Sequence, residues 1–146
     1  MELLRLIALD SQDLGVISAH LQDAVVRADD LVYVPRQRRF LLALRRFDWE
    51  APEGEPPRRR LAALHFERVS AVRRLGIDPG REDQVLNLLA ITFEETDAPS
   101  GTLTLVFSGG AAVRLDVECI EAQLKDLGPA WEAAGRPAHP STDKDD

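Results

Sequence analysis

Residues 102–117 read TLTLVFSGGAAVRLDV and contain two runs in which apolar residues alternate with other residues. A period of two is typical of a β-strand with one buried face, so Val113, Leu115 and Val117 are expected to point inward and Arg114 outward. The Gly-Gly pair between the runs suits a two-residue turn that needs positive φ. A phosphate-binding loop would be followed by a helix instead. The stretch therefore predicts an antiparallel β-hairpin.

The same alternation recurs on both sides of this hairpin. Turns rich in Gly, Pro and charged residues separate the runs. In the run RFLLALRRFDW, Phe47 and Trp49 fall out of phase with Phe40, so a β-bulge near Arg45 and Arg46 is predicted. The expected strands are LLRLIAL (3–9), DLVYV (30–34), RFLLALRRFDW (39–49), RLAALHFERV (60–69), SAVRRLGI (70–77) and VLNLLAITFEE (85–95).

Two stretches show helical spacing instead, with apolar residues every three or four positions. The first covers residues 10–25 and has Asp10 or Ser11 as its N-cap. The second runs from about Glu118 to Leu127 and is ended by a Gly-Pro pair. The sequence thus predicts one helix near each end of the strand-rich region.

This order of elements predicts an α+β, mainly β fold. It consists of an N-terminal helix, about seven antiparallel strands and a closing C-terminal helix. Seven strands and a last helix that covers an open end are typical of a pleckstrin-homology-like (PH-like) barrel or sandwich. An open antiparallel sheet with both helices on one face is the alternative.

The length of 146 residues suits a single domain. We expect one globular domain over residues 1–131 and a disordered acidic tail over residues 132–146, which have almost nothing apolar to bury. No apolar run approaches the ~18 residues of a membrane span, and the first residues lack the pattern of a signal peptide. The single cysteine excludes an intramolecular disulfide, so a cytoplasmic location is expected.

Four long stretches resemble one known family. They are LIALDSQDLGVISAHLQDAVV (6–26), RFLLALRRFDWE (39–50), DQVLNLLAITFEETDAP (83–99) and LVFSGGAAVRLDVECIEAQLKDLGPAW (105–131). They are similar to the bacterial domain-of-unknown-function family 2948, and the resemblance covers nearly the whole chain to about Trp131. It implies a compact bacterial cytoplasmic protein and carries no activity, cofactor or catalytic residue to positions of this chain.

Basic charge is concentrated in the middle of the chain. Residues 27–81 hold thirteen arginines against eight carboxylates, although the whole chain has a net charge of −7. If their turns meet at one end of a barrel, these side chains form a solvent-exposed rim that can bind an anionic ligand or nucleic acid. Nucleic acid is the less expected ligand, because most phenylalanines occupy core positions. A solvated, neutralised surface is the alternative interpretation. The arginines of the expected rim are Arg36, Arg38, Arg39, Arg58, Arg59 and Arg60.

A protein partner is the other hypothesis for function. Such a partner is expected to contact a strand edge, the closing helix or the corner of the segment RRFDWE, which contains Arg45, Arg46 and Trp49. No catalytic motif is present, and the histidines show no metal-ligand spacing, so neither a metal nor a cofactor is expected. We therefore favour a non-catalytic PH-like interaction module over a binder of an anionic ligand or nucleic acid, while an enzyme stays a third possibility.

Cys119 is the only cysteine and the best candidate nucleophile by residue type. A thiol in the first turn of a helix can become acidic, but Asp116, Glu118 and Glu121 lie close to it in sequence and oppose a thiolate. We expect Cys119 to fill a small gap between the last strand and the closing helix, as buried free cysteines do.

Overall fold

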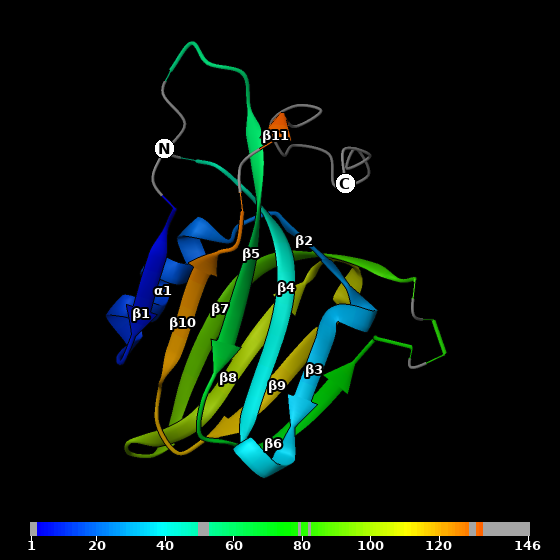
Figure 1. Ribbon diagram of the computed structural model, residues 1–146. Helices are drawn as coiled ribbons and strands as arrows, with labels where there is room; N and C mark the ends of the chain where they lie inside the picture. The colour runs from blue at the N-terminus through cyan, green and yellow to red at the C-terminus, as the bar shows by residue number, and fades with distance from the viewer. Residues whose placement is uncertain (1–2, 50–52, 79, 82, 129–130, 133–146) are drawn as a thin grey trace.

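The computed structural model describes residues 3–49, 53–78, 80–81, 83–128 and 131–132 (Figure 1). A curved antiparallel β-sheet surrounds the core, and one α-helix lies against it. The elements are β1 (Arg5–Ala8), α1 (Ser11–His20), β2 (Ala24–Arg27), η1 (Ala28–Asp30), β3 (Leu31–Val34), η2 (Pro35–Gln37), β4 (Arg39–Phe47), β5 (Arg58–Phe66), β6 (Val69–Leu75), β7 (Val85–Asp97), β8 (Ser100–Phe107), η3 (Ser108–Gly110), β9 (Ala112–Val117), β10 (Ala122–Asp126) and β11 (Trp131–Glu132).

The strands follow the order β1-β10-β5-β4-β2-β7-β8-β9-β6, with β3 paired to β4 and β11 paired to β5. The sheet curls until β3 and β6 lie side by side in Figure 1. There the Tyr33 hydroxyl donates to the Val69 carbonyl at 3.0 Å, and the Val69 amide donates to the Arg38 carbonyl at 2.8 Å. The edge strands β1 and β6 do not pair with each other, so the sheet is not a closed barrel.

The hairpin of residues 102–117 is confirmed as β8 and β9. These strands pair antiparallel, with Leu103 opposite Leu115 and both side chains fully buried. Gly109 and Gly110 adopt φ of 73° and 78° in the turn, a conformation that other residues reach only with strain. The antiparallel, mainly β class predicted from the alternation is therefore confirmed.

The predicted closing helix at Glu118–Leu127 is wrong, because part of this stretch forms strand β10. β10 pairs with β1 on one side and with β5 on the other. Every second residue of β10 points inward, namely Ala122, Leu124 and Asp126. The hydrogen bonds that β10 makes on both of its edges outweigh the local helical spacing of its apolar residues. With β2 and β11 also missed, eleven strands are found in the described residues instead of about seven.

The N-terminal helix α1 is confirmed, but it ends at His20 and does not reach residue 25. Asp10 is its N-cap, and its carboxylate accepts a hydrogen bond from the Asp13 amide at 2.8 Å. Leu14 and Ile17 are buried where α1 contacts β1 and β7. A helix therefore does cover an open side of the sheet, but it is the first helix and not a last one.

No bulge interrupts β4 where one was predicted. The register with β5 runs without a shift from Phe40 opposite Phe66 to Phe47 opposite Arg59. Phe47 consequently lies on the side of the sheet opposite to Phe40, yet it is only 1% exposed because Trp49 packs against its ring. The expected tail covers residues 132–146; Glu132 belongs to β11, and residues 133–146 lie outside the described residues.

Candidate functional site

The two arginine groups of the expected rim lie at opposite ends of the β4–β5 pair. Arg36, Arg38 and Arg39 precede or begin β4, whereas Arg58, Arg59 and Arg60 begin β5, which runs antiparallel to β4. Seven residues of strand separate the two ends, a distance of about 24 Å. The structure therefore does not bring the six arginines together into one rim.

The expectation that all six arginines are exposed is also wrong. Arg36 and Arg38 are exposed and Arg39 and Arg58 are half-buried, but Arg59 and Arg60 are each only 3% exposed. Arg60 continues the inward positions of Ala62 and Leu64 along β5. Its burial is compensated by Asp48, whose Oδ2 accepts a hydrogen bond from Arg60 Nε at 3.2 Å.

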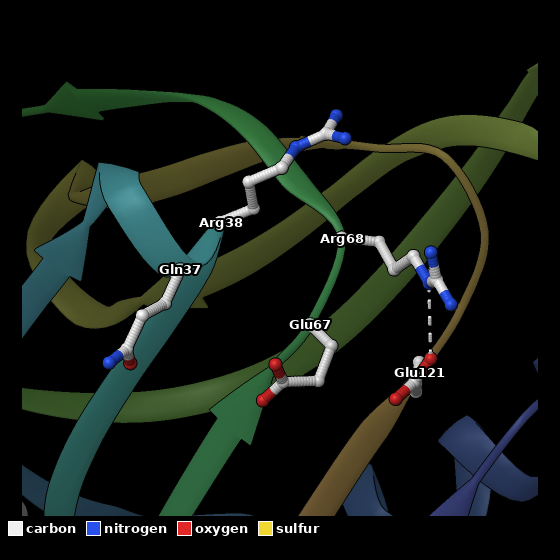
Figure 2. Close-up of a pocket in the computed structure, with 5 residues that line it drawn as sticks. All are labelled: Gln37, Arg38, Glu67, Arg68 and Glu121. Atoms are coloured by element: carbon white, nitrogen blue, oxygen red, sulfur yellow. Dashed lines mark hydrogen bonds and ion pairs between the residues drawn. The ribbon is translucent and has the colours of Figure 1, made fainter.

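The group at the start of β4 borders a pocket of about 190 Å³, shown in Figure 2. Arg68 is directed at Glu121, and their closest atoms are 3.4 Å apart, whereas the Arg38 guanidinium points away from both. Arg38 pairs with Glu118 at 2.7 Å, and Arg39 pairs with Glu67 at 2.8 Å. These glutamates neutralise the arginines, so this pocket is a poor anion site. The residues that line it are Gln37, Arg38, Glu67, Arg68 and Glu121.

The group at the start of β5 belongs to a buried network of charged side chains. Arg46 and Asp126 form a bidentate ion pair, with Nε to Oδ1 at 2.8 Å and Nη2 to Oδ2 at 2.9 Å. Asp126 Oδ2 also accepts from the Leu4 amide at 2.8 Å. Beside this pair, Asp48 Oδ2 accepts from Arg58 and Arg60, each at 3.2 Å. Arg46, expected to contact a partner, is thus inside the protein and bonded to Asp126 of β10.

Electrostatics in this network favour the charged form of Asp126. Burial raises the pKa of Asp126, but the hydrogen bonds from Arg46 and the Leu4 amide lower it, as do the charges of Arg46 and Arg60. The net result is a pKa below the ordinary value of 3.8. Asp126 therefore carries its negative charge at neutral pH and balances the guanidinium of Arg46.

The corner around Trp49 lies on the outer side of β4. The Phe47 and Trp49 rings pack edge to face, with centroids 4.7 Å apart and an interplanar angle of 62°. Trp49 Nε1 donates to the Gln22 carbonyl at 3.3 Å, and the Arg59 guanidinium lies 6.0 Å from the Phe47 centroid. Trp49 keeps 39% of its surface exposed, so it is the accessible member of this cluster.

The outer side of the sheet next to this corner carries several apolar residues, beside the polar side chains of His65 and Gln123. Lys125 on β10 is directly opposite Ala63 on β5, and Ala63 is opposite Ala43 on β4. Leu41 on β4 and Leu61 on β5 are the next outward residues on either side of this pair. Ile7 and Leu127 are 57% and 50% exposed at its border, and the other members are half-buried. We call this surface the outer apolar face and define it by Ile7, Leu41, Ala43, Leu61, Ala63 and Leu127.

Positively charged side chains lie beside the outer apolar face. Arg5 and Lys125 are directly opposite each other on β1 and β10, and both are exposed. Gln123 accepts two hydrogen bonds from Arg5 at 2.8 and 3.1 Å through its side-chain oxygen. Neither Arg5 nor Lys125 has a carboxylate partner in the described part of the chain. Arg45 is opposite Leu61 at the other border. This region is therefore locally positive on a chain whose net charge is −7.

Cys119 is not in a helix. It lies in the bend between β9 and β10 and is half-buried, so the expected position in a gap beneath a closing helix is wrong. Within the residues that the structure describes, no three His, Cys, Asp or Glu side chains are grouped so that they could hold a metal ion.

The chain was compared with models of known protein families, and one family matches. The profile of the family described as protein of unknown function (DUF2948) matches residues 4–139. The chain belongs to the DUF2948 family. No curated protein and no solved structure matches it. Since the match spans β1 through β11, the outer apolar face and the buried charge network both lie within the DUF2948 region. None of the described helices is long and apolar enough to cross a membrane.

Proposed function

We propose that this DUF2948 protein is a non-catalytic interaction module of the bacterial cytoplasm that binds a protein partner through the outer apolar face. One observation carries the proposal: β4 and β5 carry apolar residues on both sides in their central parts. Their inward residues form the core, and Leu41, Ala43, Leu61 and Ala63 point outward. Antiparallel sheets that face water on one side normally carry polar residues there, and strands apolar on both sides are typical of sheets covered on both faces.

The chemistry of this face indicates the kind of partner. Arg5 and Lys125 lie beside apolar side chains, so an amphipathic segment with acidic residues beside its apolar side is complementary to the face. Strands β1, β10, β5 and β4 together span roughly 15–20 Å, which accommodates one α-helix of about 10–12 Å diameter. Trp49 extends the accessible surface beyond Arg45 and is a residue type that often dominates binding energy.

The proposal predicts binding of a designed amphipathic helical peptide whose leucine side is flanked by glutamates. A peptide with lysines in place of the glutamates is expected to bind at least about tenfold more weakly, because it meets Arg5 and Lys125 with like charge. Fluorescence anisotropy of labelled peptides measures both affinities. The variant Ala63→Glu places a charge in the centre of the face and is expected to weaken binding of the glutamate peptide by about tenfold or more.

Ala112→Glu is the matched control, because Ala112 is also a half-buried, outward-pointing alanine, but on β9 in the other half of the sheet. It is expected to leave peptide affinity unchanged. Equal binding of the two peptides, or equal losses in Ala63→Glu and Ala112→Glu, would contradict the proposal. A dimer that Ala63→Glu dissociates, detected by sedimentation velocity, would show that a second copy covers the face instead.

A further inference from the structure

The outer side of the other half of the sheet, formed by β7, β8, β9 and β6, contains a polar hollow of about 460 Å³. This volume is within the range of small-molecule sites and exceeds the pocket beside Arg38. In the strand order, β2 separates these strands from β4 and β5, which carry most of the outer apolar face. We call it the threonine hollow and define it by Arg73, Thr92, Glu94, Thr102, Thr104 and Arg114.

Two arginines face each other across strands in the threonine hollow. Arg73 on β6 is the register partner of Arg114 on β9, and like charges directly opposite each other destabilise a sheet. The positive charge of Arg73 is offset by Asp116. Arg73 Nη2 lies 3.1 Å from Asp116 Oδ1, and both side chains are well exposed. Arg114 is exposed, and no carboxylate in the described ranges pairs with it. An anion between the two guanidinium groups would remove this repulsion.

Threonine hydroxyls extend the same row. Thr104 is opposite Arg114, and Thr92 is opposite Thr104, so their side chains line one path across three strands. Thr102 Oγ1 donates to Asp116 Oδ1 at 3.4 Å. In the described part of the chain the hydroxyls of Thr92 and Thr104 make no hydrogen bond to protein, so both are available to a ligand. Two carboxylates lie beside this row: Glu94 on β7 is opposite Thr102 and lines the hollow, and Asp116 on β9 is opposite Thr102 on its other side.

We propose that the threonine hollow binds the phosphate or carboxylate group of a small molecule. Arg114 binds the anionic oxygens, the hydroxyls of Thr104 and Thr92 donate to the same group or to the body of the ligand, and Arg73 lies beside the group while it stays paired with Asp116. Glu94 repels additional negative charge, which favours ligands with one anionic group or with a hydroxyl or amine at the far end.

Titration with inorganic phosphate and, in a separate arm, with acetate tests the site through backbone amide shifts in ¹⁵N-labelled protein. We expect saturable shifts centred on Thr104 and Arg114 with at least one of the two anions. Arg114→Gln is expected to weaken that binding by about tenfold, because a charge-assisted hydrogen bond is lost. Glu94→Gln is expected to tighten it by about two- to threefold, because an opposing charge is removed.

Arg36→Gln is the control for general surface charge, because Arg36 is exposed and lies on η2 in another part of the fold. It changes net charge as Arg114→Gln does and is expected to leave binding within about twofold. Equal effects of Arg36→Gln and Arg114→Gln, or no saturable shift with either anion, would overturn the proposal. Binding unaffected by Arg114→Gln in a variant with native amide dispersion would do the same.

Discussion

Asp126→Ala is expected to lower the free energy of unfolding by about 3–5 kcal/mol, since it leaves the buried guanidinium of Arg46 without its carboxylate. Arg46 is 2% exposed and its two hydrogen bonds to Asp126 are 2.8 and 2.9 Å long, so water cannot replace the lost partner. The substitution also removes the acceptor of the Leu4 amide. Urea unfolding followed by circular dichroism measures the loss.

Two controls separate the charge effect from the loss of a side chain. Arg46→Leu combined with Asp126→Leu removes both charges and is expected to recover most of the stability that Asp126→Ala loses. Glu118→Ala breaks the exposed pair with Arg38 and is expected to cost less than about 1 kcal/mol. A double variant no more stable than Asp126→Ala would show that the loss does not come from an unpaired charge.

The same pair predicts a dependence on pH. The pKa of Asp126 is below its ordinary value of 3.8 in the folded protein, so its carboxylate stabilises the fold above this pH. That contribution is lost as the pH falls through the folded-state pKa. The stability difference between the native chain and Asp126→Asn is therefore expected to be largest at neutral pH and to shrink below pH 3.8. A difference that stays constant between neutral and acidic pH would contradict this account.

Gly101→Ala is expected to destabilise the protein by about 1–3 kcal/mol or more. Gly101 is a buried residue of β8, and a Cβ there would overlap the Phe93 ring and the Glu94 carbonyl oxygen. An aromatic ring over a strand glycine is a known way to compensate for the missing side chain. The carbonyl belongs to the paired strand β7, so the clash cannot be relieved without disturbing the β7–β8 hydrogen bonds.

Gly15→Ala is the matched control for this substitution. Gly15 lies on the exposed side of α1, and no heavy atom is within 4 Å of a Cβ placed on it. Alanine there is expected to stabilise the protein by about 0.5–1 kcal/mol, because it favours the helix. Thermal unfolding of the two variants measures whether each substitution lowers or raises the stability of the protein. A Gly101→Ala variant as stable as the native chain would mean that Phe93 and the strand can move aside cheaply.

Most of the fold is predictable from alternation. β8 and β9 each repeat apolar residues at every second position, and one-sided burial makes that period visible in the sequence. β10 is not predictable in this way. Its stretch contains Ile120, Leu124 and Leu127 at helical intervals, and only the pairing with β1 and β5, both distant in sequence, selects the strand.

The candidate sites are only partly predictable, because they depend on which strands become neighbours. Alternation correctly places Arg114 on an outward position, but its juxtaposition with Arg73 follows from the pairing of β9 with β6. A signal for the outer apolar face does exist in the runs RFLLALRRF and RRRLAALHF, which are apolar at both odd and even positions. The sequence predicts Arg46 and Arg60 at the surface, and this is wrong because nothing local indicates the carboxylate that each one meets, Asp126 on β10 and Asp48 just after β4.

The position of β1 constrains the order in which the protein can fold. β1 pairs with β10 alone, and Leu4 bonds to Asp126, 122 positions further along the chain. Closing so long a loop is entropically costly and becomes favourable only when most of the sheet already exists. Until β10 arrives, β5 keeps a free edge beside apolar residues, which is a template for pairing with another unfinished chain. The last step of assembly is thus the one that protects the nascent protein from aggregation.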